Sequence, residues 1–513
     1  MKLNSAITKK LPYWDILLDQ IGVSQSLIDW SNELLNEYAV IIVNSALNKE
    51  EKEKILRFVR NGGSILIEAD FAEKIFKINT KKVYLRYLFS REKVFGYYLP
   101  LIDLYRNCSV PSDANTLKDQ KGRHVISDFK EDKGKIVIIP GNFVSALADK
   151  RVLRKKIFSS IKESPSERVS KVSKGGIYHF IRTALEYLYH ARNYPFISLW
   201  NFPGSSKNIF LFRIDTDYGS PEQVELLYKT LMENNIRGTW FVETKSAEDW
   251  INKYSSFKGQ EIGLHCYRHR IFNSYKKNYE NLKKGIGVLD KAAINARGTA
   301  APFGEWNTLF GKSAENLGFE YSSEFSYSYD NFPHLSVLDD GLNNVLQIPI
   351  HPISFGRLHQ AEYDEDELLE YFKEVIKRKI SLCEPVILCT HPQEERFDIH
   401  KKIFSFINEF DLQNVTFIEY ARWWKERSKI RFSVLFNNGN LKIETETSDE
   451  SFWLRVIHPS KEDYLMSLSG NDYKKINLPE YKFETGLQPE ILRKYTDRML
   501  KDDILFEIRK RRL

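Results

Sequence analysis

The sequence predicts an α/β protein in three parts: a parallel-sheet domain, an incomplete (β/α) barrel and a small antiparallel β domain. Near the N-terminus, apolar runs enclose an amphipathic charged segment. Between about residues 208 and 424, strand-like and helix-like segments alternate seven or eight times. After about residue 430, apolar and polar residues alternate around an Asn-Gly pair. These patterns indicate, in turn, a βαβ unit, a barrel and a hairpin.

The first predicted domain covers residues 1–160. From Tyr38, the apolar run "YAVIIV" is followed by a charged amphipathic segment, the turn Asn61-Gly62-Gly63 and a second run, "SILIEAD". Strand, helix and strand in this order predict a parallel sheet covered by helices. A further run, "GKIVIIPGNF", adds a buried strand. The pattern resembles the flavodoxin-like, amidotransferase-type domains that are fused to some sugar-processing enzymes.

A catalytic role for this first domain is not expected. A glutaminase needs a cysteine on a tight strand-to-helix turn together with a histidine partner. The one cysteine here, Cys108, lies in "YRNCSVPS" without flanking glycines. We therefore predict a non-catalytic, structural or docking domain, and a glutamine-dependent amidotransferase is the disfavoured hypothesis.

A linker and a packing helix are predicted for residues 161–207. The stretch "KESPSERVSKVSKGG" is polar and contains Pro165. After it, apolar residues recur at helical spacing between Ile177 and Leu188. This helix is expected to pack across the domain junction.

The barrel is predicted for residues 208–428 and the C-terminal β domain for residues 429–513. Strands are expected at "NIFLFRID", "RGTWFVE", "EIGLHC", "FEYSSEF", "VLQIPIHP", "PVILCTH" and "VTFIEY". Ser220 and Pro221 fit the N-cap and first position of the first barrel helix. The pair Asn438-Gly439 is a strong hairpin signal.

Composition restricts the class of protein. The net charge is only +7 over 513 residues, which argues against a nucleic-acid partner and allows peripheral contact with an anionic membrane surface. The four cysteines form no CxxC pair, so disulfides are not implied. The N-terminal stretch lacks a signal-peptide pattern, and no run approaches 18 apolar residues. A cytoplasmic location is expected.

Acids and histidines follow several predicted strands. Asp215 and Asp217 come where the run "IFLFRI" ends, and His265 and His269 follow "EIGL", four residues apart as on one face of a helical turn. Strand ends converge at one mouth of a barrel, so these side chains can form one Asp-His-His metal site. His391, after "VILCT", is a candidate proton donor at the same mouth.

Four motifs in this order resemble the polysaccharide deacetylases with a NodB-homology domain. The family's paired acids correspond to "RIDTDYG", its His-Ser/Thr-x-x-His motif to "HCYRH", its Arg-x-Pro-x-Gly motif to "AAPFG", and its final Leu-x-His motif to "ILCTH". Cys266 takes the Ser/Thr place. The resemblance covers the middle of the chain.

The resemblance implies metal-dependent hydrolysis of an N-acetyl group on a sugar, as in bacterial surface-polysaccharide or glycolipid synthesis. By position, Asp217, His265 and His269 would hold a divalent metal, usually Zn²⁺. Asp215 would be the general base, and His391 would protonate the departing amine. The Asp-x-Asp spacing leaves the division of roles between the two acids open.

One departure concerns the arginine that orients the base. The family's arginine position holds Ala300 here. Arg213 lies two residues before Asp215, so strand alternation places both on one face and makes Arg213 a substitute; Arg297 is the second candidate. A similar Arg-x-Asp-x-Asp pattern occurs in deformylases of lipid-linked aminosugars, so an N-formyl or lipid-linked substrate is an alternative.

Substrate contacts are predicted for Pro302, Phe303, Gly304, Trp306, Glu324 and His351. For Trp306 and His351, packing inside the fold is the alternative. The competing hypothesis for the whole chain is a non-catalytic carbohydrate-binding or scaffold protein that keeps the barrel. Ala300 and the altered acid spacing favour it, whereas the retained acids and histidines oppose it.

Overall fold

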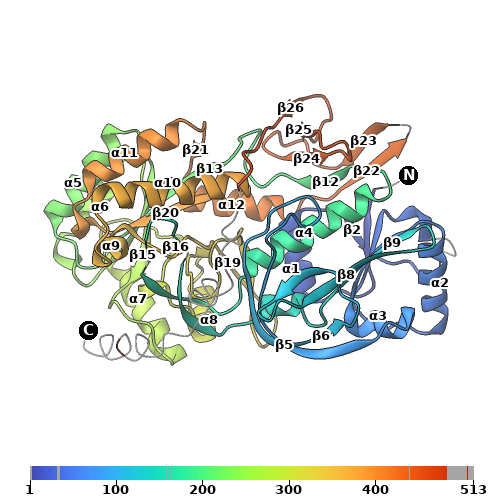
Figure 1. Ribbon diagram of the computed structural model, residues 1–513. Helices are drawn as coiled ribbons and strands as arrows, with labels where there is room; N and C mark the ends of the chain where they lie inside the picture. Colours follow the sequence, from blue (N-terminus) through green and yellow to red (C-terminus); the bar gives the residue numbers. More distant parts are fainter. Residues whose placement is uncertain are drawn as a thin grey trace.

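The computed structural model describes residues 3–31, 35–157, 159–162, 165–437, 439–481 and 505. In Figure 1 the N-terminal sheet lies at one end of the molecule and the barrel at the other, with α4 between them. The C-terminal strands lie beside α4 and β12. No helix in the described ranges is long and apolar enough to cross a bilayer.

The N-terminal sheet has nine strands in the order β2-β1-β3-β4-β9-β8-β7-β5-β6. Its first five strands are parallel, and their order by sequence is 2-1-3-4-5, that of flavodoxin-like sheets. The predicted parallel sheet is therefore present. Beyond β9 it continues as an antiparallel extension, which was not predicted from the sequence. The elements are β1 (Ser5–Ile7), α1 (Pro12–Ile21), β2 (Gln25–Leu27), β3 (Val40–Val43), α2 (Lys49–Arg60), β4 (Ser64–Glu68), α3 (Ala69–Phe76), β5 (Thr80–Phe89), β6 (Ile102–Pro111), β7 (Thr116–Asp119), β8 (His124–Glu131) and β9 (Gly134–Ile139).

The βαβ unit predicted from Tyr38 is β3-α2-β4. Asn48 caps α2 by accepting from the Glu51 amide, and Glu51 accepts from the Asn48 amide in return. Asn61 ends the helix, and Gly62 takes a φ of 96°, which favours glycine. Cys108 lies buried in β6, where burial raises the pKa of its thiol to about 12. A thiol in this state is not an activated nucleophile.

The connecting region is more ordered than the predicted linker. β10 (Val152–Lys156) pairs antiparallel with β11 (Ser166–Ser170), which takes up part of the polar stretch. The predicted packing helix is α4 (Lys174–His190), buried along most of its length in the core that joins the N-terminal sheet to the barrel. β12 (Phe196–Leu199) then pairs with β24 of the C-terminal region, so residues assigned to the linker complete a distant sheet.

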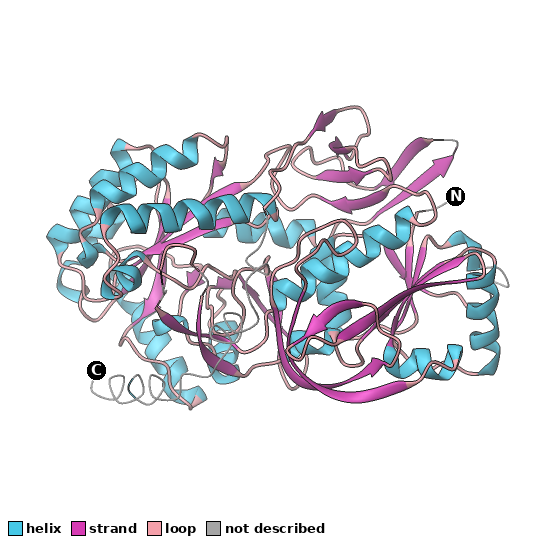
Figure 2. Ribbon diagram, viewed as in Figure 1, coloured by secondary structure: helices cyan, strands magenta, loops and turns pink. Residues whose placement is uncertain are grey.

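The barrel sheet has the order β18-β19-β17-β16-β15-β14-β13-β20. All neighbouring strands from β19 to β20 are parallel, and β18 adds antiparallel to β19. Because β20 and β18 are not paired with each other, the barrel is incomplete, as predicted. Helices cover its outer face (Figure 2). The elements are β13 (Ile209–Asp215), α5 (Pro221–Glu233), β14 (Gly238–Glu243), α6 (Asn252–Ser255), β15 (Glu261–Cys266), α7 (Tyr275–Lys291), β16 (Gly298–Thr299), α8 (Thr308–Asn316), β17 (Tyr321–Ser322), β18 (His334–Val337), β19 (Leu342–Gln347), α9 (Phe355–Gln360), α10 (Glu365–Ser381), β20 (Val386–Thr390), α11 (Phe397–Asn408), β21 (Gln413–Asn414) and α12 (Phe417–Arg427).

Two sequence predictions about elements near the barrel differ from the structure. The run "VTFIEY" begins a helix rather than forming a strand, because Thr416 and Glu419 form a capping box at the start of α12. His265 and His269 do not share a helical turn. His265 lies in β15, and His269 lies in the loop that follows it.

The C-terminal region contains the predicted hairpin and a second sheet. β22 pairs with β23 from Asn437–Asn440 outward, which confirms the hairpin, although Asn438 lies outside the described residues. The second sheet has the order β12-β24-β25-β26 and is antiparallel throughout. The strands are β22 (Phe432–Asn437), β23 (Asn440–Thr445), β24 (Trp453–Ile457), β25 (Asp463–Ser467) and β26 (Tyr473–Lys475).

Candidate active site

The site lies where adjacent barrel strands end. β13 alternates its side chains: Phe210, Phe212 and Ile214 pack in the outer core beneath the helices, which leaves Arg213 and Asp215 on the inner face. β13 pairs with β14 on one side and β20 on the other, and β14 pairs with β15. The carboxyl ends of these parallel strands therefore meet, as in other barrels of this kind.

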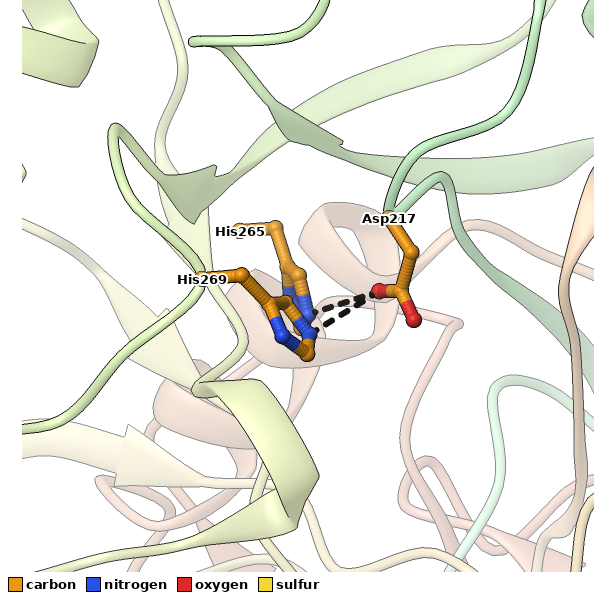
Figure 3. A group of neighbouring side chains, drawn as sticks. All are labelled: Asp217, His265 and His269. Carbon is orange, nitrogen blue, oxygen red and sulfur yellow. Dashed lines mark ion pairs between the residues drawn. The ribbon is translucent and has the colours of Figure 1, made fainter. Parts of the chain in front are cut away.

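Three side chains converge on one point at these ends (Figure 3). Asp217 Oδ1 lies 3.2 Å from His265 Nε2 and 3.1 Å from His269 Nε2. One donor atom from each of the three residues lies within 4.8 Å of the others. Asp217 has a φ of 41°, in the left-handed region that aspartate tolerates better than most residues. This turn directs the carboxylate back toward the imidazoles.

The three donors fit a divalent metal ion. Two ligands that each lie about 2.0–2.1 Å from an ion, at tetrahedral or octahedral angles, are themselves separated by roughly 2.8–3.4 Å. The Asp217–His265 and Asp217–His269 separations fall in that interval. Asp217 Oδ1 is buried without a hydrogen-bond partner among the described residues, as expected for an atom reserved for a cation. Burial raises the pKa of Asp217, but His391, His269 and His265 outweigh it, and the pKa lies well below its ordinary value.

Arg213 and Asp215 form a buried, two-pronged ion pair. Arg213 donates from Nε to Oδ1 and from Nη2 to Oδ2, each at 2.7 Å. Its Nη1 donates to the Ser323 carbonyl oxygen at 2.6 Å and to Ser323 Oγ at 3.1 Å. Burial raises the pKa of Asp215, and the Arg213 charge reverses the shift, so this pKa lies below its ordinary value. Asp215 is thus held ionised in a fixed orientation.

His391 follows β20 and faces the same centre. Its Nε2 lies 3.7 Å from Asp217 Oδ2, and its Nδ1 lies 2.6 Å from Glu394 Oε1. Glu394 also accepts from Thr390 Oγ1 at 3.1 Å. Burial lowers the pKa of His391, but the negative charges of Glu394 and Asp217 raise it by more, so that this pKa lies at about 10. His391 is therefore protonated at neutral pH.

These groups line one cavity of about 1000 Å³. Asp215, Asp217, His265, His269 and His391 all contribute to its wall. The hairpin β10–β11 and α9 contribute Arg154, Glu167 and Arg357 to the same wall. The cavity is at the upper end of the range for small-molecule sites, so it has room for more than one sugar ring.

Residues 210–322 match the polysaccharide deacetylase family model. No curated protein matches the chain. Among solved structures, the chain is similar to a protein of Mycobacterium smegmatis described as a polysaccharide deacetylase, with 20% identity, a TM-score of 0.38 and coverage of 44% of this chain and 93% of that one. It is also similar to the allantoinase PuuE, with 16% identity, a TM-score of 0.38 and coverage of 44% and 93%. A family 4 carbohydrate esterase pseudoenzyme of Bacillus anthracis has 14% identity, a TM-score of 0.32 and coverage of 54% and 93%.

In the segment that matches the family model, the two arginine candidates occupy different places. Arg213 contacts Asp215, whereas Arg297 is exposed just before β16, at the opposite end of the strands from Asp215. Ala300 is buried, and its amide donates to the Leu264 carbonyl oxygen. The guanidinium that contacts Asp215 therefore comes from within β13, and the side chain of residue 300 is a methyl group.

Two of the six predicted substrate contacts, Phe303 and Gly304, line the cavity. The other four do not lie in the described lining. Trp306 is buried against Tyr327, with ring centroids 4.5 Å apart, and Pro302 is also buried. Packing explains these two positions better than substrate contact.

Glu324 and His351 are buried in hydrogen-bond networks behind the wall. Glu324 accepts from the Ala301 amide and from Ser322 Oγ, at 3.1 and 2.9 Å, and burial raises its pKa to about 7. His351 contacts Asp330 at 3.1 Å and Tyr371 at 2.9 Å. Both side chains are therefore held by hydrogen bonds inside the fold, and neither lines the cavity.

Glu394 was missed at the sequence level. It follows His391 by three residues in "HPQE", and a short 3₁₀ turn, Pro392–Glu394, brings its carboxylate back to the imidazole. An acid three residues after a candidate proton donor, across a proline, is the signal that could have identified it.

Proposed function

We propose that the barrel is a metal-dependent hydrolase that removes an N-acetyl or N-formyl group from a sugar in bacterial surface-polysaccharide or glycolipid synthesis. The observation that supports this most directly is the convergence of Asp217, His265 and His269 in a cavity that also holds a paired aspartate and a protonated histidine. The match of residues 210–322 to the polysaccharide deacetylase model supports the same reaction class.

Asp217, His265 and His269 would hold the ion, for which Zn²⁺ is the first candidate because two imidazoles and a carboxylate are ligands that zinc accepts. The bound ion would supply Lewis-acid polarisation of the acyl carbonyl and activation of water. Asp215, fixed by Arg213, would accept the proton of the attacking water. His391 would donate the proton from Nε2 to the departing amine nitrogen, with Glu394 holding Nδ1.

These roles account for every bond and proton of the hydrolysis. One O–H bond of water breaks as its oxygen adds to the acyl carbon and one proton passes to Asp215. The carbon–nitrogen bond then breaks, the nitrogen takes the proton of His391, and the second water proton leaves when the acid product ionises. The products are a free aminosugar and acetate or formate. The substrate of this cytoplasmic enzyme would be a free, nucleotide-linked or lipid-linked sugar or an oligosaccharide or polymer, and the N- and C-terminal modules would be non-catalytic.

The test combines metal analysis with amine release. The purified wild-type chain is expected to retain close to one equivalent of a divalent metal and to release amine from a panel of N-acetyl and N-formyl sugars. His265→Ala should lose both, and His124→Ala, which changes an exposed histidine of the N-terminal sheet, should lose neither. Full metal and full turnover in His265→Ala would overturn the ligand assignment.

The second candidate is a carbohydrate-binding scaffold without turnover. Ala300 in the family's arginine position favours it, whereas the Arg213–Asp215 pair opposes it because the pair supplies the missing orientation. A folded protein that binds N-acyl sugars but neither retains metal nor releases amine would select this candidate.

A further inference from the structure

We propose that a second cavity, at the junction of the three modules, binds a small phosphorylated sugar. This junction cavity has a volume of about 370 Å³ and lies apart from the Asp217 centre. Its wall comes from the segment 96–99 between β5 and β6, from α4, from the turn 381–383 after α10, and from β24, β25 and residues 476–481. The volume suits a compact ligand of one sugar ring with a substituent.

The walls of the junction cavity carry three cations: Arg182, Arg455 and Lys461. Arg455 is neutralised by Asp463, to which it donates at 3.0 and 2.7 Å. Arg182 and Lys461 share one buried carboxylate, Glu186, which lies 3.3 Å from each of them.

The charged side chains around the junction cavity leave a net positive charge. Glu480 also lines the cavity, but it forms an ion pair with Lys93 just outside it. Glu186 is further engaged by Tyr97, whose hydroxyl donates to it at 2.6 Å. Among the described residues, two cations on one carboxylate leave one positive charge without a counterion, and a positively charged, partly enclosed cavity favours an anion.

The character of the other wall residues indicates what the anion carries. The wall also contains three tyrosines, Tyr97, Tyr98 and Tyr178, and two polar residues, Thr183 and Asn201. Flat aromatic faces beside side-chain donors and acceptors suit a hydroxylated ring, while arginine and lysine suit a phosphate. A sugar monophosphate combines both features in the available volume.

The position of the junction cavity separates it from the catalytic centre. Ser381, Leu382 and Cys383 lie just before β20, whereas His391 lies just after it. A ligand in the junction cavity would touch all three modules at once, and it would therefore stabilise their assembled arrangement by mass action.

Isothermal titration calorimetry on the full chain tests this inference with glucose 6-phosphate, inorganic phosphate and glucose as probes. Glucose 6-phosphate is expected to bind at least tenfold more tightly than inorganic phosphate, and glucose should give no heat. Lys461→Glu, which changes a side chain that is 55% exposed, should weaken glucose 6-phosphate binding at least tenfold. Lys442→Glu makes the same charge change at an exposed site on β23 and should leave binding within twofold.

Three results would overturn the inference. They are no binding by the folded wild-type chain, equal weakening in Lys461→Glu and Lys442→Glu, and loss of binding in Asp217→Asn, which would place the ligand in the catalytic cavity. If Lys461→Glu does not fold, Lys461→Ala serves in its place, with an expected weakening of at least threefold. Metal content and amine release do not enter this readout, so its outcome is independent of the proposed hydrolysis.

Discussion

Removing the Arg213 guanidinium should damage both the stability of the barrel and the state of the base. Arg213→Met preserves most of the side-chain volume but removes four hydrogen bonds, two to Asp215 and two to Ser323. Both members of the pair are buried, with side-chain exposures of 0% for Arg213 and 9% for Asp215. Breaking a buried pair by removing one partner leaves an uncompensated charge and costs about 3–5 kcal/mol of unfolding free energy.

The assay is urea unfolding of Arg213→Met, Asp215→Asn and the double variant. The double-mutant cycle should give a coupling energy of several kcal/mol, because the second change removes the charge that the first leaves stranded. The matched control is Arg422→Met. Arg422 donates to Glu320 at 3.0 and 2.8 Å in the same two-pronged way, but its side chain is 59% exposed, so the loss should stay below about 1 kcal/mol.

Loss of Arg213 should also change how Asp215 titrates. The Arg213 charge is the main influence that lowers the pKa of Asp215 against the effect of burial, so this pKa should rise in Arg213→Met. The acid limb of kcat/KM should therefore move to higher pH, because the base must be ionised to accept a proton. The reasoning is refuted if Arg213→Met costs no more than Arg422→Met and leaves the acid limb in place.

Three further predictions concern groups around the cavity. Burial raises the pKa of Glu324 from 4.5 to about 7 in the folded protein, so its protonated form stabilises the fold by about 3 kcal/mol below pH 4.5, and this contribution is lost as the pH rises to 7. Glu324→Gln should therefore raise the unfolding free energy at pH 8 but not at pH 4. A change in urea unfolding that does not depend on pH would contradict this. Glu394→Gln should lower the pKa of His391 from about 10, so the alkaline limb of kcat/KM and the NMR titration of that imidazole should both move to lower pH. An unchanged titration would show that Glu394 does not set the charge of His391. Gly304 has a φ of 58°, and a Cβ there would overlap the Phe325 ring, so Gly304→Ala should lower the unfolding free energy by about 1–3 kcal/mol and lower the thermal midpoint. Gly318 has a φ of 77° with open space around it, so Gly318→Ala should lower the unfolding free energy by about 1 kcal/mol through the backbone alone. Equal losses in the two variants would exclude the Phe325 contact.

The sequence determined the features that depend on local pattern and on the topology of parallel strands. The period of two in β13 placed Arg213 and Asp215 on one face, and the spacing of acids and histidines after apolar runs placed the proposed metal ligands at strand ends. Parallel strands of a barrel carry their carboxyl ends to one mouth, so residues far apart in the chain could be assigned to one site without knowledge of side-chain packing.

Only the tertiary structure decided how those ends are supported. Arg213 is fixed by Ser323, and β12 is completed by β24, through contacts that no local pattern encodes. Glu324 and His351 follow strands as the proposed metal ligands do, yet their side chains form hydrogen bonds inside the fold and do not line the cavity. Which way such a residue faces depends on the partners that distant segments bring to it, because a buried polar group must be satisfied wherever the fold provides a donor or acceptor.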